Sequence, residues 1–282
     1  DMDIDGIDAQ VLYPNSGMSA GTSQDPEMRT SCTRAYNDWL SEFCITDQER
    51  LVGVAVIPIF DTAYALGELR RVRGLGGISG AYIPSFPTEY GGRPLNDSVY
   101  DSFWETAQEL TTPVSLHLGG GVTGLTHVDP KQILPLSALS PIALAQPLAI
   151  LIFSGVLQRY PELKIVLVEG GIGWLPYFLE RMDTVYKRHR YWTKSRLTEA
   201  PSFYFHRQMY GTFEEDRTGV FARELIGVDN LLWASDYPHA EATFPESQRI
   251  LSEILEGVPQ DEQDLIVGGN CARMYGFDSD IK

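Results

Sequence analysis

Four side chains that could bind a metal ion or exchange protons come directly after apolar segments of the chain. His117 ends one such segment and Glu169 ends another, while Asp236 follows a third and His239 lies three residues later. A buried carboxylate is costly unless it is paired or bound to a metal. Imidazole and carboxylate groups are the usual ligands of zinc and similar divalent ions. The four residues therefore indicate a metal site that also performs acid–base chemistry.

Apolar segments alternate with amphipathic segments along the chain, and this order is typical of a parallel sheet covered by helices. The expected strands lie at residues 6–14, 51–59, 78–84, 113–118, 163–171, 207–213 and 230–238. Seven strand–helix units are one fewer than a (β/α)8 barrel contains. Catalytic groups of such barrels lie at the carboxyl ends of the strands. We therefore expect the four side chains to meet at one rim of an α/β barrel.

Two helices have clear sequence signals. Asp25 and Pro26 predict the start of a helix, as N-cap and first-turn residue. Beyond them Met28, Trp39 and Phe43 belong to a series of apolar residues at three- and four-residue steps, which indicates an amphipathic helix. A second helix is expected from residue 174 to about residue 189.

The composition is that of one globular domain, residues 1–282, with 43% hydrophobic and 21% charged residues. The 22 basic and 38 acidic residues give a formal net charge of −16. Such a surface repels nucleic acid and anionic membranes. A Gly-x-Gly-x-x-Gly motif after the first expected strand and a Walker lysine are both absent from the sequence, which disfavours nucleotide binding. We expect a small-molecule partner, and neither nucleic acid nor membrane.

Cysteine content and hydropathy bear on the cellular compartment. Cys32, Cys44 and Cys271 share no metal-binding spacing, and a sparse, odd count is typical of reduced thiols in the cytoplasm. The most apolar stretch, residues 144–153, is interrupted by a glutamine and a proline and is expected to be too short to cross a bilayer. A cytoplasmic protein is expected.

Three longer segments resemble the amidohydrolase superfamily, in the branch that includes aminocarboxymuconate semialdehyde decarboxylase. These segments are LKIVLVEGGIGWLPYFLERMD (163–183), NLLWASDYPH (230–239) and GNCARMYGF (269–277). The resemblance covers residues 6–277 and implies a distorted (β/α)8 TIM barrel with a divalent metal, zinc or alternatively manganese. Members of this superfamily perform hydrolysis or non-oxidative decarboxylation.

The resemblance also implies roles for individual residues. His117 matches a metal-binding histidine, and Asp236 matches an aspartate that contacts the metal and takes a proton from bound water. Glu169 falls where the decarboxylases carry a catalytic histidine, and His239 is expected to line the site. Each residue also has a purely structural interpretation. His117 could be a core histidine and Asp236 a turn residue. Glu169 could be a carboxylate that accepts hydrogen bonds from loop amides, and His239 a histidine of a surface loop. Glu214 is explained by the helix start that follows it.

One part of the family pattern is missing from the sequence. The family places a His-x-His or Glu-x-His pair of metal ligands on its first barrel strand, and no two of the five histidines here are two residues apart. The chain also begins with Asp1 rather than Met. We expect that the first strand is missing, so that the barrel is incomplete at its N-terminus and the metal is absent or weakly bound.

The leading functional hypothesis is a metal-dependent hydrolase that acts on a small carboxylated or cyclic substrate, with Asp236 as the base for metal-activated water. Glu169 favours hydrolysis because a carboxylate is a weaker proton donor near neutral pH than an imidazolium. The alternatives are a non-oxidative decarboxylase of the same superfamily and a catalytically impaired barrel with a binding role. A homodimer is expected because the loop at residues 119–140 is rich in apolar residues.

Overall fold

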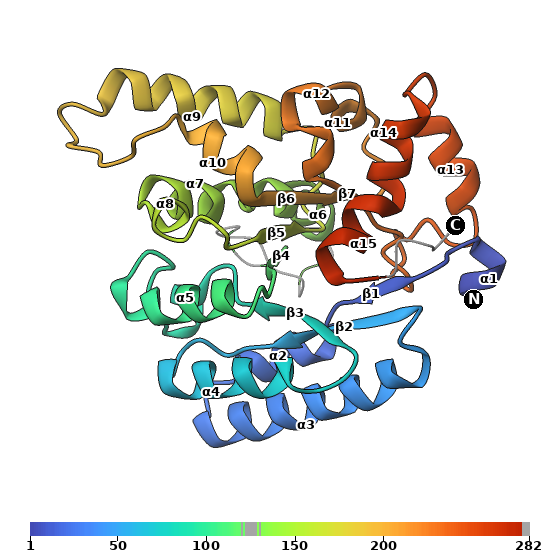
Figure 1. The fold of residues 1–282 in the computed structure, drawn as a ribbon, viewed down its shortest axis with the longest axis horizontal. Coiled ribbons are helices and arrows are strands. Elements are labelled where there is room, and N and C mark those ends of the chain that lie inside the picture. The colour runs from blue at the N-terminus through green and yellow to red at the C-terminus, as the bar shows by residue number, and fades with distance from the viewer. Residues whose placement is uncertain (120, 122–128, 130, 278–282) are drawn as a thin grey trace.

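A computed structural model describes residues 1–282 except 120, 122–128, 130 and 278–282 (Figure 1). Seven parallel strands pair in chain order to form one curled sheet, a half-barrel. The strands are β1 (Gln10–Leu12), β2 (Leu51–Val56), β3 (Ile78–Ile83), β4 (Val114–His117), β5 (Ile165–Val168), β6 (Met209–Phe213) and β7 (Leu231–Trp233). This confirms the expected α/β class and strand order. The absence of a first barrel strand stays a prediction.

Helices follow the strands and cover the outer face of the sheet (Figure 1). They are α1 (Met2–Asp5), α2 (Ser16–Gly21), α3 (Pro26–Cys44), α4 (Thr62–Arg73), α5 (Asp101–Glu109), α6 (Ile133–Ala143), α7 (Ala145–Phe153), α8 (Val156–Arg159), α9 (Leu175–His189), α10 (Pro201–Gln208), α11 (Arg217–Phe221), α12 (Arg223–Ile226), α13 (Ser247–Ile254), α14 (Gln260–Asp264) and α15 (Asn270–Tyr275). Short 3-10 turns lie at Ile45–Asp47, Pro87–Tyr90, Ser98–Tyr100 and Val228–Asn230, and a π-helical segment lies at Leu265–Gly269.

The sheet is buried on both faces, as its nearly continuous apolar strands indicate. In β2, Val54 and Val56 point into the barrel, whereas Ala55 packs outward against the helices. The interior is also filled from the C-terminal side, because Met274 and Tyr275 of α15 pack against the inward residues of the strands. This packing fixes the sheet, and therefore the positions of the residues at its two ends.

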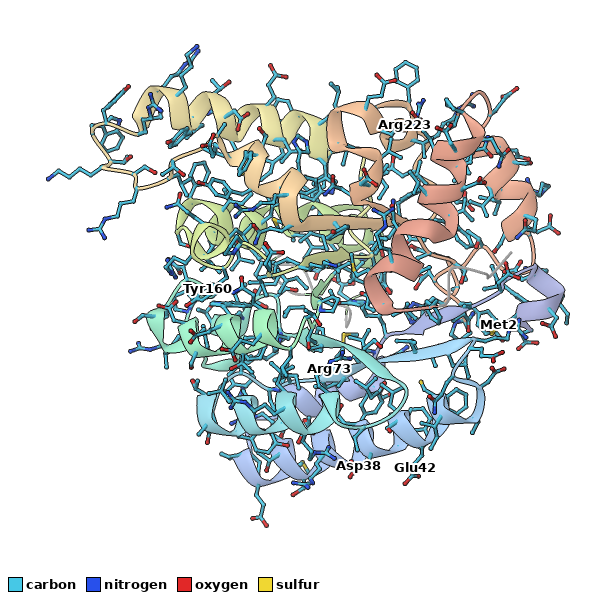
Figure 2. All side chains as sticks on the ribbon, viewed as in Figure 1. Met2, Asp38, Glu42, Arg73, Tyr160 and Arg223 are labelled. Carbon is cyan, nitrogen blue, oxygen red and sulfur yellow. The ribbon has the colours of Figure 1, made fainter. Side chains whose placement is uncertain are left out.

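Helix α3 begins as expected, because the Asp25 side chain accepts hydrogen bonds from the N–H groups of residues 27 and 28. Its apolar stripe, however, lies mostly on the solvent side: Met28, Trp39 and Phe43 are 58%, 53% and 45% exposed. The side of the helix that faces the sheet buries Leu40 and Cys44 in the core together with polar residues such as Asn37. Figure 2 shows its acidic residues on the outer edge of the molecule.

The stretch Ile133–Phe153 is long and apolar enough to cross a membrane by length and composition alone. Residues 144–153, the stretch predicted to be too short to span a bilayer, are the second half of this longer segment. The structure divides the stretch into α6 and α7 at Leu144, and α7 buries Leu148 and Leu151 completely in the core. In this fold the stretch forms two outer-layer helices.

The loop behind the dimer prediction, residues 119–140, lies partly outside the described residues. Its last third forms the start of α6, where Leu134 and Leu139 are 81% and 47% exposed. The homodimer stays a prediction.

Candidate active site

The expected site residues meet at the carboxyl ends of the strands. His117 is the last residue of β4, Glu169 follows β5 directly, and Asp236 lies three residues beyond β7. Glu169 and Asp236 both have a left-handed backbone, with φ of 55° and 56°. Residues other than glycine rarely adopt this backbone conformation, and those that do cluster at functional sites.

His117 is an almost fully buried imidazole, with a side chain that is 5% exposed. Its Nδ1 lies 2.8 Å from the carbonyl oxygen of Leu118, and its Nε2 lies 2.9 Å from Glu169 Oε1. Both partners are hydrogen-bond acceptors, so this environment favours the protonated imidazole, which can donate from both nitrogens. Burial alone would lower the pKa of His117, but the hydrogen bond and charge of Glu169 outweigh it and raise the pKa.

Glu169 is fixed by β6 and by the loop that follows it. Its N–H donates to Thr212 Oγ1 at 2.8 Å. The residues after it are held by Asp216, whose Oδ2 accepts hydrogen bonds from the N–H groups of Ile172 and Gly173 at 2.7 and 2.6 Å. Burial raises the pKa of Glu169, but His117 lowers it more, so the net shift is downward. Glu169 is therefore the ionised partner of the His117 imidazolium.

Asp236 connects the other side of the rim to the first strand. Its Oδ1 accepts a hydrogen bond from His239 Nδ1 at 2.8 Å. The Nε2 of His239 lies 2.9 Å from Asn15 Nδ2, in the loop after β1. With a proton on Nδ1 for Asp236, the Nε2 of His239 can accept a hydrogen bond from the Asn15 amide. His239 is 43% exposed and Asp236 is 15% exposed.

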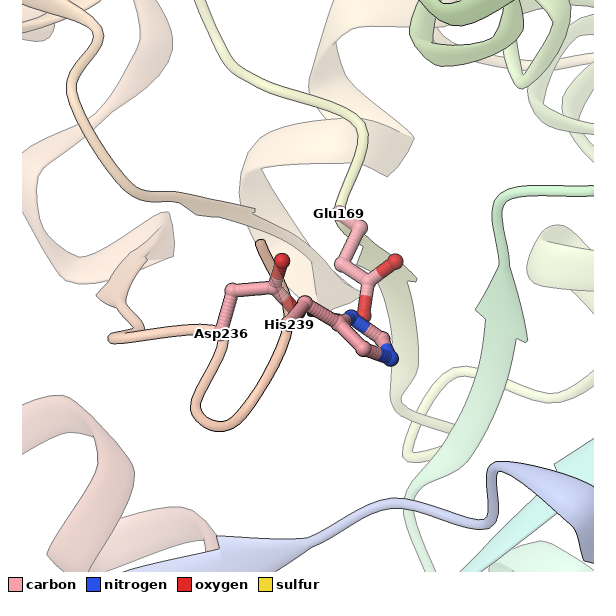
Figure 3. A group of neighbouring side chains, drawn as sticks. All are labelled: Glu169, Asp236 and His239. Carbon is pink, nitrogen blue, oxygen red and sulfur yellow. Dashed lines mark hydrogen bonds and ion pairs between the residues drawn. The ribbon is translucent and has the colours of Figure 1, made fainter. Parts of the chain in front are cut away.

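Glu169, Asp236 and His239 form one compact group (Figure 3). One ligand atom from each lies within 4.8 Å of the other two. Burial raises the pKa of Asp236, and the charge of Glu169 and a hydrogen bond to it raise it further. Together these effects raise the pKa of Asp236 to about 6, whereas the pKa of Glu169 is lowered.

Glu214, directly after β6, is a third carboxyl group of this rim. Its Oε1 is buried and has no hydrogen-bond partner among the described residues. Burial raises its pKa to about 7, and the negative charges of Asp236 and Glu169 contribute to the shift. The sequence assigned Glu214 to a helix start, but that role belongs to Asp216, which caps α11. The burial of Glu214 depends on distant strands and has no local sequence signal.

A divalent cation fits this arrangement. Carboxylate and imidazole groups are suitable ligands for zinc and manganese. Three acidic side chains lie close together, and one buried oxygen of Glu214 lacks a partner, so a cation would offset their mutual repulsion. The bond from His117 Nδ1 to Leu118 O is the usual outer-shell contact that orients a metal-binding imidazole and leaves Nε2 available.

Comparison with known proteins identifies the family. A family model described as amidohydrolase matches residues 5–277. The chain belongs to this amidohydrolase family. Gamma-resorcylate decarboxylase of Polaromonas sp. (strain JS666) is 29% identical over 260 residues, which are 84% of this chain and 74% of that protein. 2-Amino-3-carboxymuconate-6-semialdehyde decarboxylase of Dictyostelium discoideum is 23% identical over 287 residues, 99% of this chain and 75% of that protein.

A solved structure has the same fold. It is a dihydroxybenzoic acid decarboxylase of Polaromonas sp. JS666 with bound manganese and the inhibitor 2-nitroresorcinol. It is 24% identical, with a TM-score of 0.81 over 98% of this chain and 83% of that chain. The predicted resemblance is thus confirmed, and the chain is an enzyme of the amidohydrolase superfamily.

The predicted site residues all lie at one rim, but their grouping differs from the expected one. The sequence paired His117 with Asp236 as metal ligands, whereas the structure groups Asp236 with Glu169 and His239 and binds His117 to Glu169. The roles of all four residues stay predictions.

Proposed function

We propose that the chain is a metal-dependent, non-oxidative decarboxylase of a small, unsaturated carboxylic acid. The observation that carries the proposal is the cluster of carboxyl and imidazole groups at the catalytic rim of this amidohydrolase barrel. The named relatives, which are decarboxylases, favour this chemistry over the hydrolysis that the sequence put first.

His117 and Asp236 are the proposed metal ligands, with Glu169 and His239 within reach of the same position. A divalent cation bound there would orient the substrate carboxylate and withdraw electron density from the reacting group. Manganese and zinc are both candidates for this cation. We also propose, as expected from the sequence, that this chain binds the cation weakly. Glu214 adds negative charge to the same rim.

The second half of the reaction needs a proton. Loss of CO2 breaks a carbon–carbon bond and leaves an electron pair on the substrate carbon, which then takes up a proton. We assign this transfer to Glu169, because its carboxyl group lies at the rim beside both proposed metal ligands, His117 and Asp236. Glu169 takes up this proton from solvent water in each turnover, because His117 and Asp236 would give up their own protons on binding the metal.

Hydrolysis is the second candidate. Glu169 stands where decarboxylases of this branch carry a histidine, and a carboxylate beside Asp236 would suit the activation of water. A barrel that only binds its ligand is the third. These candidates differ in what they do to the substrate and in whether they hold a metal ion.

Turnover in D2O separates the three functions. The manganese-loaded enzyme is incubated with 2,6-dihydroxybenzoate and related aromatic acids, and with esters and lactones, and products are read by NMR. A decarboxylase releases CO2 and places one deuterium on the carbon that lost it. Cleavage of an ester or lactone without CO2 would support hydrolysis instead, and a protein that neither turns over nor holds metal would support the binding role.

Substitutions at position 169 test the proton transfer. Glu169→Gln cannot deliver a proton and should lose about 100- to 10,000-fold in turnover. Glu169→His restores a donor of the family type and should retain decarboxylation. Glu180→Gln, on the exposed face of α9, is the matched control and should behave as wild type. Near-normal turnover of Glu169→Gln would remove Glu169 from the mechanism.

A further inference from the structure

A cavity of about 260 Å3 lies at the end of the barrel opposite Glu169 and Asp236. Its lining comes from the amino ends of β5, β6 and β7 and from α15. The main polar lining residues are Lys164, Arg207, Tyr210, Asp229, Asn270 and Arg273. Because all strands run in the same direction, this cavity is separated from the catalytic rim by the length of the sheet.

The cavity collects positive charge in a strongly acidic protein. Three of the six residues are cationic and only Asp229 is acidic, whereas the whole chain carries −16. Arg273 is held in place by Asn270 Oδ1 at 3.2 Å and by Asp229 Oδ1 at 3.3 Å. Arg207 is held by the carbonyl oxygen of Leu157 at 2.6 Å. Two guanidinium groups are therefore positioned before any ligand arrives.

Lys164 is the group that lacks a partner. It directly precedes β5 and is half-buried, and its ammonium makes no hydrogen bond or ion pair within the described part of the chain. The hydroxyl of Tyr210 also has no hydrogen-bond partner there. Burial raises the pKa of Tyr210, while the charge of Arg273 lowers it, which places the phenol close to that guanidinium. A donor-rich surface of this kind is complementary to an oxyanion.

We propose that this cavity binds a small oxyanion, a carboxylate or a phosphate, through Lys164, Arg273 and the hydroxyl of Tyr210. Water occupies about 30 Å3 per molecule in the liquid, so the cavity has room for a small organic anion. The Lys164 ammonium and the Arg273 guanidinium pair with the anion, and Tyr210 donates a hydrogen bond to it. The proposal does not depend on the reaction at the catalytic rim.

Ligand titration at constant ionic strength tests the site, with inorganic phosphate and succinate as the two probes. Wild type should show saturable binding by calorimetry with a matching rise in melting temperature. Asp236→Asn should bind equally well, because it alters only the catalytic rim. The tighter of the two probes identifies the source of the anion, phosphate or carboxylate.

Two cavity variants and one control complete the test. Lys164→Met and Arg273→Met should each weaken binding by about tenfold or more. Lys187→Met removes the same charge from an exposed position on α9 and should bind as wild type. Circular dichroism shows whether each variant is folded. If Lys164→Met does not fold, Arg273→Met is used to test the site instead. The proposal is overturned if neither probe binds saturably below about 20 mM, if Lys164→Met binds like Lys187→Met, or if Asp236→Asn abolishes binding.

Discussion

The protons of the rim are shared among a few carboxyl and imidazole groups. His117 has an acceptor beside each ring nitrogen and a raised pKa, Glu169 beside it has a lowered pKa, and Asp236 and Glu214 have raised pKa values. This distribution follows from geometry, because Glu169 lies next to the imidazole of His117, whereas Asp236 and Glu214 lie near the carboxylate of Glu169. Glu214, whose buried Oε1 has no hydrogen-bond partner among the described residues, has the pKa closest to neutral pH.

Glu214 should make the metal-free protein less stable as the pH rises. Its pKa is about 7 in the folded protein against an ordinary value of 4.5, so between these values the unfolded chain has lost a proton that the folded protein keeps. Stability from this group therefore falls between about pH 4.5 and pH 7. Glu214→Gln should remove the decline and stabilise the protein by about 1–2 kcal/mol at pH 8, after allowance for partial solvent exposure.

Urea unfolding in EDTA at pH 5 and pH 8 measures this effect. Glu180→Gln is the control, because Glu180 is exposed and lies away from the rim. An identical pH dependence in Glu214→Gln and wild type would show that Glu214 does not hold a proton in the folded state.

Manganese affinity should increase with pH. A cation must compete with protons for His117 Nε2 and for the Asp236 carboxyl group, and the pKa values of both residues are raised. Binding should therefore be weak near pH 5.5, should strengthen toward pH 8 and should release protons. Calorimetry in two buffers with different ionisation enthalpies counts the released protons. A dissociation constant that is equal at the two pH values would contradict this ligand set.

The contact between α3 and the sheet depends on one buried amide. Asn37 is fully buried, and its Nδ2 donates to Val56 O at 2.9 Å and to Glu68 Oε1 at 2.8 Å. Its Oδ1 accepts from Val56 N–H at 2.8 Å. Asn37→Leu should leave these groups without partners and destabilise the protein by about 2–4 kcal/mol. Denaturant unfolding gives the value, with the exposed Asp47→Asn as control.

The sequence predicts elements well where a local signal defines both ends. Helix α9 is expected from residue 174 and is observed as Leu175–His189, and β3 is expected at 78–84 and observed as Ile78–Ile83. The sixth strand was expected to begin at residue 207, but Pro201 starts α10, which continues to Gln208. Aromatic residues in this segment satisfy both periodicities, so only tertiary packing decides between helix and strand.

Much of the rim was also predictable, because strand ends can be located from hydrophobic runs. His117, Glu169 and Asp236 were found in this way. The pairing of His117 with Glu169 and the burial of Glu214 were not predictable, since they depend on contacts between strand ends that are more than 20 residues apart in the sequence. The exposed apolar stripe of α3 shows that the same is true of helices. Sequence periodicity identifies an apolar face, but it does not tell which part of the molecule covers that face.

On the scale of the whole molecule, the apolar outer face of α6 is the candidate surface for the predicted homodimer. Leu134 and Leu139 are exposed, and Ile142 is 50% exposed on the same helix. If this face forms the expected homodimer, replacing Leu134 and Leu139 by Glu should shift the protein to monomer at micromolar concentration. Light scattering coupled to chromatography gives the mass. A wild type that is already monomeric would contradict the dimer.

Helix α15 supports the barrel from within. The hydroxyl of Tyr275 lies 2.7 Å from that of Tyr13, which in turn lies 3.3 Å from Ser115 Oγ on the opposite side of the interior. Burial raises the pKa of Tyr13 to about 12. These contacts connect the first strand, the fourth strand and the last helix, so the C-terminal helix is part of the barrel core.

The imidazole of His239 joins the loops that follow the two edge strands, β1 and β7. It now presents a bare Nε2 to the Asn15 amide and a proton to Asp236. Coordination of a cation through Nδ1 would move that proton to Nε2, and Asn15 would have to rotate its amide to present oxygen instead of nitrogen. The side-chain NH2 resonances of Asn15 in a ¹⁵N-edited spectrum would then shift on metal binding and report the occupancy of the site. Occupancy of the catalytic rim could be followed from a residue that never contacts the ion.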